Sequence, residues 1–428
     1  MIGIGIGLML IVFLVAKAER RRRTNGAWSA AAKQLGLEVS LAFDFRMSGH
    51  GLTIAGTPGH GMTYEFGGLP WDLSFGSPEW FARNGESLRR VSVGDELFDL
   101  RVHVRGAEED VVPLLDRATR IALIEFVESG GRAEWGKLKF SPSRLERDPE
   151  TLVEAARSML ALGERLTQPG RRKLLLANAT GDPVAGVRAR NLEVLAARFR
   201  DSEEAHAAAQ PGLDDPSAAV RFVAADVERG EKSMAVLRGI VVDARVEPQL
   251  RAEAFARLVD FYGYAKARDL VPAALEQPIR LLRRAAAVAA GDAHDLEQVE
   301  RLCRSLREEP AWLIEAVVTA LEKLGDARAE PALIALLGHS DDAARTTVAR
   351  ALGVLGTVKA VEPLLPLTKG LLQTGLHAAA CDAVRRIQER LGDADAGRLS
   401  MAQAEGPSGA LSIASEGGEL SVPDLVKE

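Results

Sequence analysis

A sequence phrase that marks the start of a helix recurs about every 31 residues through the second half of this chain. It begins at Arg188, Arg221, Arg251, Arg283, Ile314, Arg345 and His377. A period of this length is typical of stacked helix pairs, in which no single pair can bury its apolar face alone. The repeat therefore predicts a mainly α fold, with an α-solenoid of about six to seven helix pairs over residues 151–392.

One repeat shows how the sequence specifies a helix pair. Residues 312–324 place Ile314, Val317 and Leu321 on one helical stripe, which predicts an amphipathic first helix. Gly325 ends that helix, because glycine readily adopts the left-handed conformation of a C-terminal cap. Pro331 then suits the first turn of a second helix.

These repeats resemble HEAT repeats, including the HEAT-like repeats of the phycobilisome-lyase type. The matching phrases are Asp182-Pro183…Val187-Arg188, Asp215-Pro216…Val220-Arg221 and Leu324-Gly325-Asp326…Glu330-Pro331-Ala332-Leu333. The resemblance covers about 210 residues and implies a solenoid that presents a long surface to partners.

The repeats depart from the HEAT pattern in one respect. The six-residue spacing from Asp to Arg holds at Asp182/Arg188 and at Asp215/Arg221, but it is missing around Arg251 and Arg345. We therefore do not expect an unbroken ladder of Asp–Arg contacts between repeats.

The N-terminus reads as a membrane anchor. The predicted anchor spans residues 2–18: an uncharged run to Ala16 is followed by Lys17 and then by Arg20, Arg21, Arg22 and Arg23. About 17 helical residues reach about 26 Å, just enough to cross the hydrocarbon core. Because the positive charges follow the run, the sequence predicts a single-pass protein of the cell membrane with its C-terminal bulk in the cytoplasm. Ala16-Lys17-Ala18 also has the form of a cleavage site, and Gly3 and Gly7 would allow two anchors to pack as a homodimer.

Residues 24–145 predict a small α+β domain. Residues 52–56 and 62–66 read as the strands of a hairpin, residues 97–104 and 137–140 as further strands, and residues 28–35 and 111–127 as helices. The run Gly94 to Gly106 resembles a segment of uncharacterised bacterial membrane-anchored proteins, a resemblance that implies no activity. After the solenoid, residues 393–428 are rich in Ala, Gly and Ser and acidic, which predicts a disordered tail.

Charge argues against nucleic-acid binding. The formal net charge is −6, and residues 152–392 hold 33 basic and 33 acidic side chains. A protein that binds nucleic acid needs a basic surface to displace counterions. One basic face within a neutral solenoid remains an alternative.

Few residues suggest chemistry. His50 and His60 flank a predicted strand and could bind a metal together with His103 or Asp99, although both also suit Gly-rich turns without a ligand. We expect no catalytic, cofactor or metal residues, since none of the common catalytic motifs is present. Phe261, Tyr262 and Tyr264 form an aromatic cluster that either packs in the core or anchors a partner.

Together these features predict a membrane-tethered scaffold without enzymatic activity, whose solenoid binds a protein partner at the cytoplasmic face. The alternative is an enzyme, either of the HEAT-like lyase type, which acts on chromophore-bearing proteins, or with a metal site in the N-terminal domain.

Overall fold

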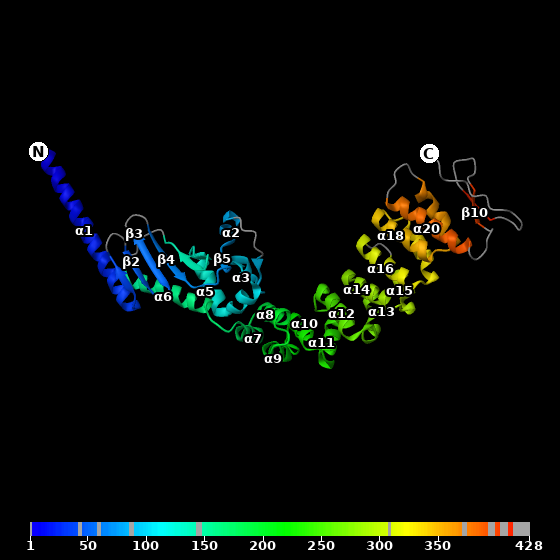
Figure 1. The fold of residues 1–428 in the computed structure, drawn as a ribbon, viewed down its shortest axis with the longest axis horizontal. Helices are drawn as coiled ribbons and strands as arrows, with labels where there is room; N and C mark the ends of the chain where they lie inside the picture. Colours follow the sequence, from blue (N-terminus) through cyan, green and yellow to red (C-terminus); the bar gives the residue numbers. More distant parts are fainter. Residues whose placement is uncertain are drawn as a thin grey trace. The chain divides into compact units, whose positions relative to one another are not determined.

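The computed structural model describes the chain as two compact units, residues 1–229 (unit 1) and residues 230–428 (unit 2). The described residues are 2–41, 45–57, 61–84, 90–142, 148–306, 310–369, 375–392, 399–402 and 410–413, with side chains described for residues 13–83 and 90–390 within these ranges. Each unit is mainly helical, and unit 1 also holds a sheet (Figure 1).

The sheet of unit 1 is antiparallel and has nine strands among the described residues, in the order β1-β2-β3-β4-β9-β8-β5-β7-β6. The strands are β1 (Glu38–Ser40), β2 (Phe45–Gly49), β3 (Leu52–Thr57), β4 (Gly61–Gly67), β5 (Ser74–Gly76), β6 (Arg90–Val91), β7 (His103–Arg105), β8 (Arg132–Glu134) and β9 (Lys137–Phe140). The predicted hairpin is confirmed, since Ile54 of β3 pairs with Tyr64 of β4. The predicted last strand is β9.

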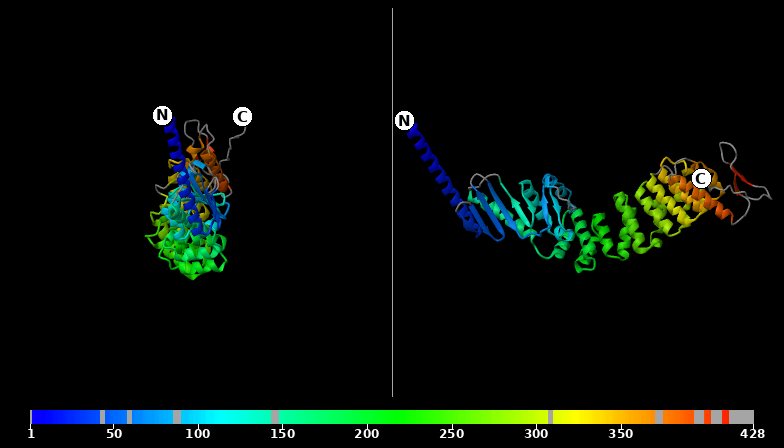
Figure 2. Two further views of the ribbon diagram at one scale, coloured as in Figure 1. Left: turned by 90° about the vertical axis from the view of Figure 1, so that its left-hand side faces the viewer. Right: turned by 45° about the horizontal axis from the view of Figure 1, so that its top comes forward.

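The helices of unit 1 are α1 (Ile2–Leu35), α2 (Pro78–Asn84), α3 (Glu96–Arg101), α4 (Glu108–Val111), α5 (Arg117–Glu128), α6 (Pro149–Leu166), α7 (Arg171–Gly181), α8 (Ala185–Arg198), α9 (Glu203–Gly212) and α10 (Ala218–Val227), with a 3-10 turn η1 (Val112–Leu114) after α4. Helices α5 and α6 run along one face of the sheet (Figures 1 and 2). Gly163 of α6 lies so close to β4 that an added Cβ would come within 2.4 Å of the Phe66 ring. The helical layer of the sheet domain thus extends beyond residue 145.

Two predictions for this domain were wrong in detail. Residues 97–104 are not one strand, because Asp95 caps helix α3 by accepting a hydrogen bond from the Phe98 amide at 3.2 Å. Phe98 is fully buried while Leu100 is 72% exposed, and only the end of the predicted strand, from His103, belongs to β7. The predicted helix over 111–127 is divided into α4, η1 and α5, since Pro113 lies in the 3-10 turn between the two helices.

The predicted short helix over 28–35 is the end of the much longer α1. Trp28 near that end is fully buried and its ring lies 5.3 Å from the ring of Phe45 in β2. Because α1 also packs against α6, the last turns of this helix are part of the sheet domain's core.

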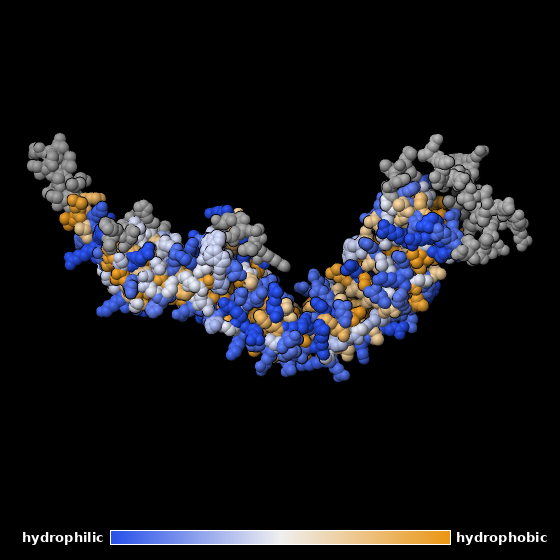
Figure 3. All heavy atoms as spheres, in the orientation of Figure 1, coloured by the Kyte–Doolittle hydropathy of each residue, from blue (hydrophilic) through white to orange (hydrophobic). Residues whose placement is uncertain are grey.

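The predicted location in a membrane is contradicted. Over the part of the chain that the structure describes, no helix combines the length and the apolar character needed to cross a bilayer. The side chains described for α1 begin at Phe13, and further along this helix Arg20, Arg21, Arg22 and Arg23 are exposed (Figure 3). The side chains of residues 2–12, including the predicted contact between Gly3 and Gly7, lie outside the described ones.

The sheet domain is joined to α7 and α8 by close and buried contacts. Gly94, before α3, lies backbone to backbone against Gly186 in α8, where an added Cβ on Gly94 would come within 2.2 Å of the Gly186 carbonyl oxygen. Arg120 of α5 is 2% exposed and donates to both carboxylate oxygens of Asp182, at 2.8 and 3.1 Å. Arg120 also donates to Asp95 at 2.8 Å. The sheet domain and the first helix pair therefore form one packed body.

An Asp–Arg ladder continues from this joint for one more step. Arg188 donates to both carboxylate oxygens of Asp215, each at 2.8 Å, and Arg221 donates to the carbonyl of Asp215 at 2.7 Å. In unit 2, Arg251 instead donates to the side chain of Gln277 at 2.7 Å. As the spacing predicts, the ladder does not continue through the repeats around Arg251.

Unit 2 consists of helix pairs in two layers. Its helices are α11 (Glu231–Val242), α12 (Pro248–Tyr262), α13 (Val271–Glu276), α14 (Arg280–Asp292), α15 (Val299–Arg304), α16 (Ala311–Leu324), α17 (Glu330–Leu336), α18 (Asp342–Leu355), α19 (Val358–Leu364) and α20 (Gly375–Gly392), with 3-10 turns at Tyr264–Lys266, Arg268–Leu270, Leu296–Gln298, Ala327–Ala329 and Leu365–Thr368. The long helices α12, α14, α16, α18 and α20 pack one against the next. Gly325 ends α16 in the left-handed conformation and Pro331 lies in the first turn of α17, as the sequence predicts.

Within the segment 393–428, the structure describes only the backbone of two antiparallel strands, β10 (Leu399–Ala402) and β11 (Ala410–Ile413). The remaining residues of the predicted tail lie outside the described ones.

Candidate functional site

Two neighbouring long helices of unit 2, α14 and α16, carry exposed apolar side chains. Leu281 and Val288 on α14 are 42% and 39% exposed, and Trp312 on α16 is 43% exposed. Leu281 and Trp312 are one repeat apart, so they occupy matching places on adjacent helices. Exposed apolar groups that gather in this way mark surfaces that bind other molecules.

Two adjoining cavities open on this face. One, of about 550 Å³, lies between α12 and α14, and the other, of about 280 Å³, lies between α14 and α16. Arg284 and Val288 line both. We name their combined lining the groove, which consists of Gln249, Ala252, Glu253, Ala256, Val259, Asp260, Leu281, Arg284, Ala285, Val288, Ala289, Asp292, Trp312, Glu315, Ala316, Thr319, Ala320 and Lys323.

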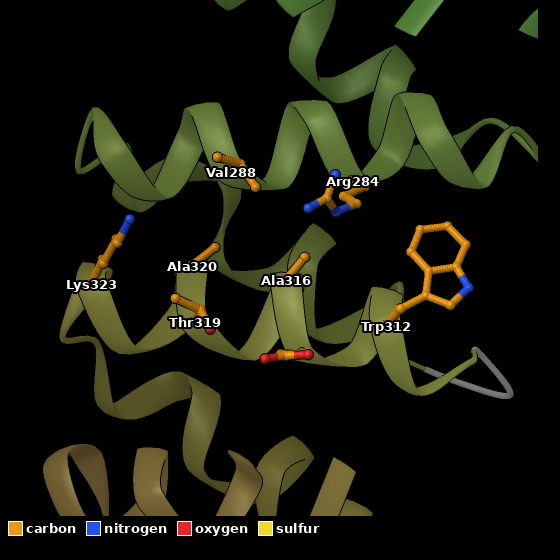
Figure 4. Close-up of a pocket in the computed structure, with 8 residues that line it drawn as sticks. Arg284, Val288, Trp312, Ala316, Thr319, Ala320 and Lys323 are labelled. Carbon is orange, nitrogen blue, oxygen red and sulfur yellow. The ribbon is translucent and has the colours of Figure 1, made fainter. Parts of the chain in front are cut away.

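Figure 4 shows how α14 and α16 form the second cavity. Arg284 and Val288 project from α14 toward α16, and Trp312 stands at the end of the cavity beside Arg284. The small side chains of Ala316 and Ala320 leave space in the cavity between the larger side chains. At the other end, Gly291 brings the two helices together, since its added Cβ would lie 2.7 Å from the Ala320 Cα.

Carboxylates outnumber cations in the groove. Its acidic members are Glu253, Asp260, Asp292 and Glu315, and its basic members are Arg284 and Lys323. Lys323 and Asp292 form an ion pair at 2.5 Å, so these two charges offset each other. The remaining lining has three carboxylates and one guanidinium, a net charge of −2.

The predicted aromatic cluster lies outside the groove and is engaged in contacts within unit 2. The Tyr262 hydroxyl donates to the Gly230 carbonyl at 3.1 Å, and the rings of Phe261 and Tyr262 lie 6.4 Å apart. All three aromatic side chains are half-buried. Their role as anchors for a partner stays a prediction.

Tyr264 belongs to a polar network between repeats. Its hydroxyl donates to Asp295 at 2.7 Å, and Arg268 donates to both oxygens of the same carboxylate at 3.1 and 3.2 Å. Burial alone would raise the pKa of Asp295, but the hydrogen bonds from Arg268, Tyr264 and Gln298 outweigh it and lower this pKa from 3.8 to about 2. Burial, followed by the nearby carboxylate, raises the pKa of the Tyr264 hydroxyl. The network stabilises the stacking of repeats.

The candidate metal ligands of the sequence analysis do not form a metal site among the described residues. His50 lies in the turn between β2 and β3 with a φ of 51°, and His60 lies outside the described residues. Asp99 accepts hydrogen bonds from Ser92 and from the backbone amides of Val93 and Gly94. His103 lies in β7, where burial and then Arg90 and Arg105 lower its pKa. Over the part of the chain that the structure describes, no cluster of three or more potential metal ligands occurs.

The sequence interpretation missed the groove and one further surface. Leu281 and Val288 fit the apolar stripe of a helix, and the repeat alone does not separate its exposed members from its buried ones. Their registry with residues 312 and 319, one repeat later, was the available signal. In unit 1, Trp71 and Trp135 are 69% and 58% exposed with rings 5.2 Å apart, and they belong to two loops that sequence alone did not link.

The layered helix pairs of unit 2 define an α-solenoid. In agreement with this class, residues 312–370 match the family model of HEAT repeats. Among solved structures, human deoxyhypusine hydroxylase in complex with glycerol is similar over 51% of this chain and 96% of its own, with 16% sequence identity and a TM-score of 0.23. A comparison with curated proteins finds no match.

Proposed function

We propose that this chain is a non-catalytic scaffold that binds a protein partner in the groove of unit 2. The carrying observation is the combination of two adjoining cavities with the exposed side chains of Leu281, Val288 and Trp312. Large apolar side chains, tryptophan above all, are the usual anchors of protein interfaces. HEAT repeats generally mediate contacts between proteins, which agrees with the match over residues 312–370.

The chemistry of the lining supports binding rather than catalysis. The groove residues include no histidine, cysteine or serine, and Thr319 supplies their one hydroxyl. Asp292, one of the acidic groups, is engaged with Lys323. Such a lining offers apolar contact area and charge selection, and it holds none of the serine, cysteine or histidine side chains that commonly serve as nucleophiles.

Site-specific crosslinking tests this function. A photoreactive amino acid replaces Val288 in one variant and Val354 in another, because Val354 on α18 is 40% exposed but lies outside the groove. After irradiation in intact cells, we expect one defined protein to be crosslinked at position 288 and not at position 354. That protein is then purified for a binding measurement.

The binding measurement decides the proposal. Val288→Asp places a charge at the centre of the groove, and we expect it to weaken binding of the purified partner at least about 10-fold, or about 1.4 kcal/mol. Val354→Asp should leave the affinity unchanged. Equal crosslinking at the two positions, or an affinity that Val288→Asp does not change, would refute binding in the groove.

A further inference from the structure

We infer that the segment received by the groove is an amphipathic helix with basic side chains beside its apolar stripe. This inference rests on the proposed function and names the chemical class of the partner. Its first support is the spacing of the apolar anchors. Leu281 and Val288 are seven residues apart on α14, which is about 10.5 Å along a helix axis.

A helix that lies along α14 presents the same spacing. Its side chains at positions i and i+7 are also about 10.5 Å apart, so two of them can meet Leu281 and Val288, while the residue at i+4 lies between. Ala285 faces that middle position and leaves room for a larger side chain. The cavities on both sides of α14 are flanked by α12 and α16, which supply the walls.

The charges of the groove determine which side chains are favoured on either side of the bound helix's apolar stripe. Glu253 and Asp260 line the wall formed by α12 and are themselves seven residues apart. Glu315 lies on the opposite wall, on α16. Lysine or arginine residues on either side of the apolar stripe would therefore face carboxylates, which favours a basic helix over an acidic one.

The same charges disfavour two other occupants. Residues 393–428 of this chain carry seven acidic and two basic side chains, so the tail would meet carboxylates of like charge in the groove. The phosphates of a nucleic acid would meet the same repulsion.

Three matched helical peptides test the inference against the full chain. They share one apolar stripe at i, i+4 and i+7, and their flanking positions hold Lys, Gln or Glu. Binding is followed by the anisotropy of a labelled peptide and by the fluorescence of Trp312, with the four tryptophans of unit 1 replaced by Phe if that chain keeps its helical circular dichroism. We expect the Lys peptide to bind at least about 10-fold more tightly than the Glu peptide, and to weaken as salt is added.

Variants of the chain test whether the groove carboxylates cause the preference for the Lys peptide. The double variant Glu253→Gln/Asp260→Asn should weaken the Lys peptide about 5-fold or more and bring its affinity close to that of the Gln peptide. Glu362→Gln, at an exposed carboxylate on α19, should change neither. Val288→Asp should weaken all three peptides.

The outcomes separate the inference from the proposed function. Equal affinities for the three peptides, all weakened by Val288→Asp, would overturn the basic helix and leave the groove as a binding site. Binding of the Lys peptide that neither the double variant nor Val288→Asp affects would overturn the inference too, because the charge selection would lie elsewhere. If none of the peptides binds with a Kd below about 1 mM, the inference is also overturned. In that case, the crosslinking result at position 288 remains as an independent test of the proposed function.

Discussion

Asp295 shows how a single buried carboxylate holds two repeats together. Its oxygens accept hydrogen bonds from Tyr264 and Arg268, which follow α12, and from Gln298, which is three residues further along the chain. An arginine that donates two N–H hydrogen bonds to the two oxygens of one carboxylate forms a strong and directional contact. Arg188 and Asp215 form the same kind of contact in unit 1, also across 27 residues.

This network predicts a loss of stability in acid. Because the folded-state pKa of Asp295 is lowered from 3.8 to about 2, its contribution is fully present above pH 4 and is lost as the pH falls from about 4 to 2. The difference corresponds to about 2 kcal/mol in the free energy of unfolding of unit 2. Urea unfolding of the chain with the four tryptophans of unit 1 replaced by Phe, followed through Trp312 between pH 7 and pH 2, measures it.

Two variants check the assignment to Asp295. Asp295→Asn should flatten the decline between pH 4 and pH 2, and Tyr264→Phe should reduce it in part, since one of the hydrogen bonds is lost. If the unmodified chain and Asp295→Asn decline equally, the acid sensitivity comes from other carboxylates.

Glycines determine how closely neighbouring long helices of unit 2 approach each other. Gly291 of α14 faces the backbone of α16, and Gly353 of α18 faces α20, where its added Cβ would lie 3.0 Å from the Ala383 Cα. Gly239 of α11 differs, because nothing lies within 4 Å of its added Cβ. Glycine is thus required for packing at position 291, closely fitted at position 353 and only tolerated at position 239.

The same substitution should have opposite effects at two of these glycines. Gly291→Ala must push α14 and α16 apart, and we expect it to destabilise unit 2 by about 1–3 kcal/mol. Gly239→Ala should stabilise unit 2 by up to about 1 kcal/mol, because alanine is the better helix former. Thermal unfolding of both variants, in the chain with the four tryptophans of unit 1 replaced by Phe and followed through Trp312, compares them. A Gly291→Ala variant as stable as Gly239→Ala would show that the close contact is not formed.

How much the sequence predicts differs between elements. Gly325 and Pro331 mark the ends of helices through local backbone preferences, so the helix pairs of the HEAT-repeat segment could be predicted. Leu100 and Val102 could not be assigned in the same way, because over so short a run the alternation of a strand and the stripe of a helix look alike. The hydrogen bond that Asp95 accepts from the Phe98 amide caps the helix and favours it over a strand.

The groove was beyond prediction for a different reason. Whether Val288 is buried or exposed depends on how α14 lies between α12 and α16, and those distances follow from small residues such as Gly291 and Ala320. Likewise, the contact between Arg120 and Asp182 joins residues 62 positions apart, which no local pattern reveals.

At the scale of the molecule, the sheet domain depends on helices that follow it. Helix α6 buries Leu152, Val153, Met159, Leu162 and Leu166. At about 2 kcal/mol for each side chain, these contribute about 10 kcal/mol, which is comparable with the whole stability of a typical domain. Arg120 would in addition lose Asp182, and a buried charge without its partner is strongly destabilising.

We therefore expect a fragment of residues 24–145 not to fold by itself, whereas residues 24–229 should fold. Trp28 is fully buried in unit 1, so tryptophan fluorescence together with circular dichroism follows urea unfolding of both fragments. The longer fragment should show a cooperative transition and the shorter one should not. A cooperative transition of the shorter fragment at a similar urea concentration would show that α6 and Asp182 are dispensable.

The close packing of Gly94 on Gly186, and of Arg120 on Asp182, has a further consequence for a protein built from stacked repeats. The first helix pair of such an array has no preceding neighbour, and its bare end would accept the far end of another copy. Contacts of that kind do not close on themselves and lead to open filaments. Here the sheet domain occupies this end of α7 and α8 and acts as an end cap, so the array does not need a polar terminal repeat to keep its copies from polymerising.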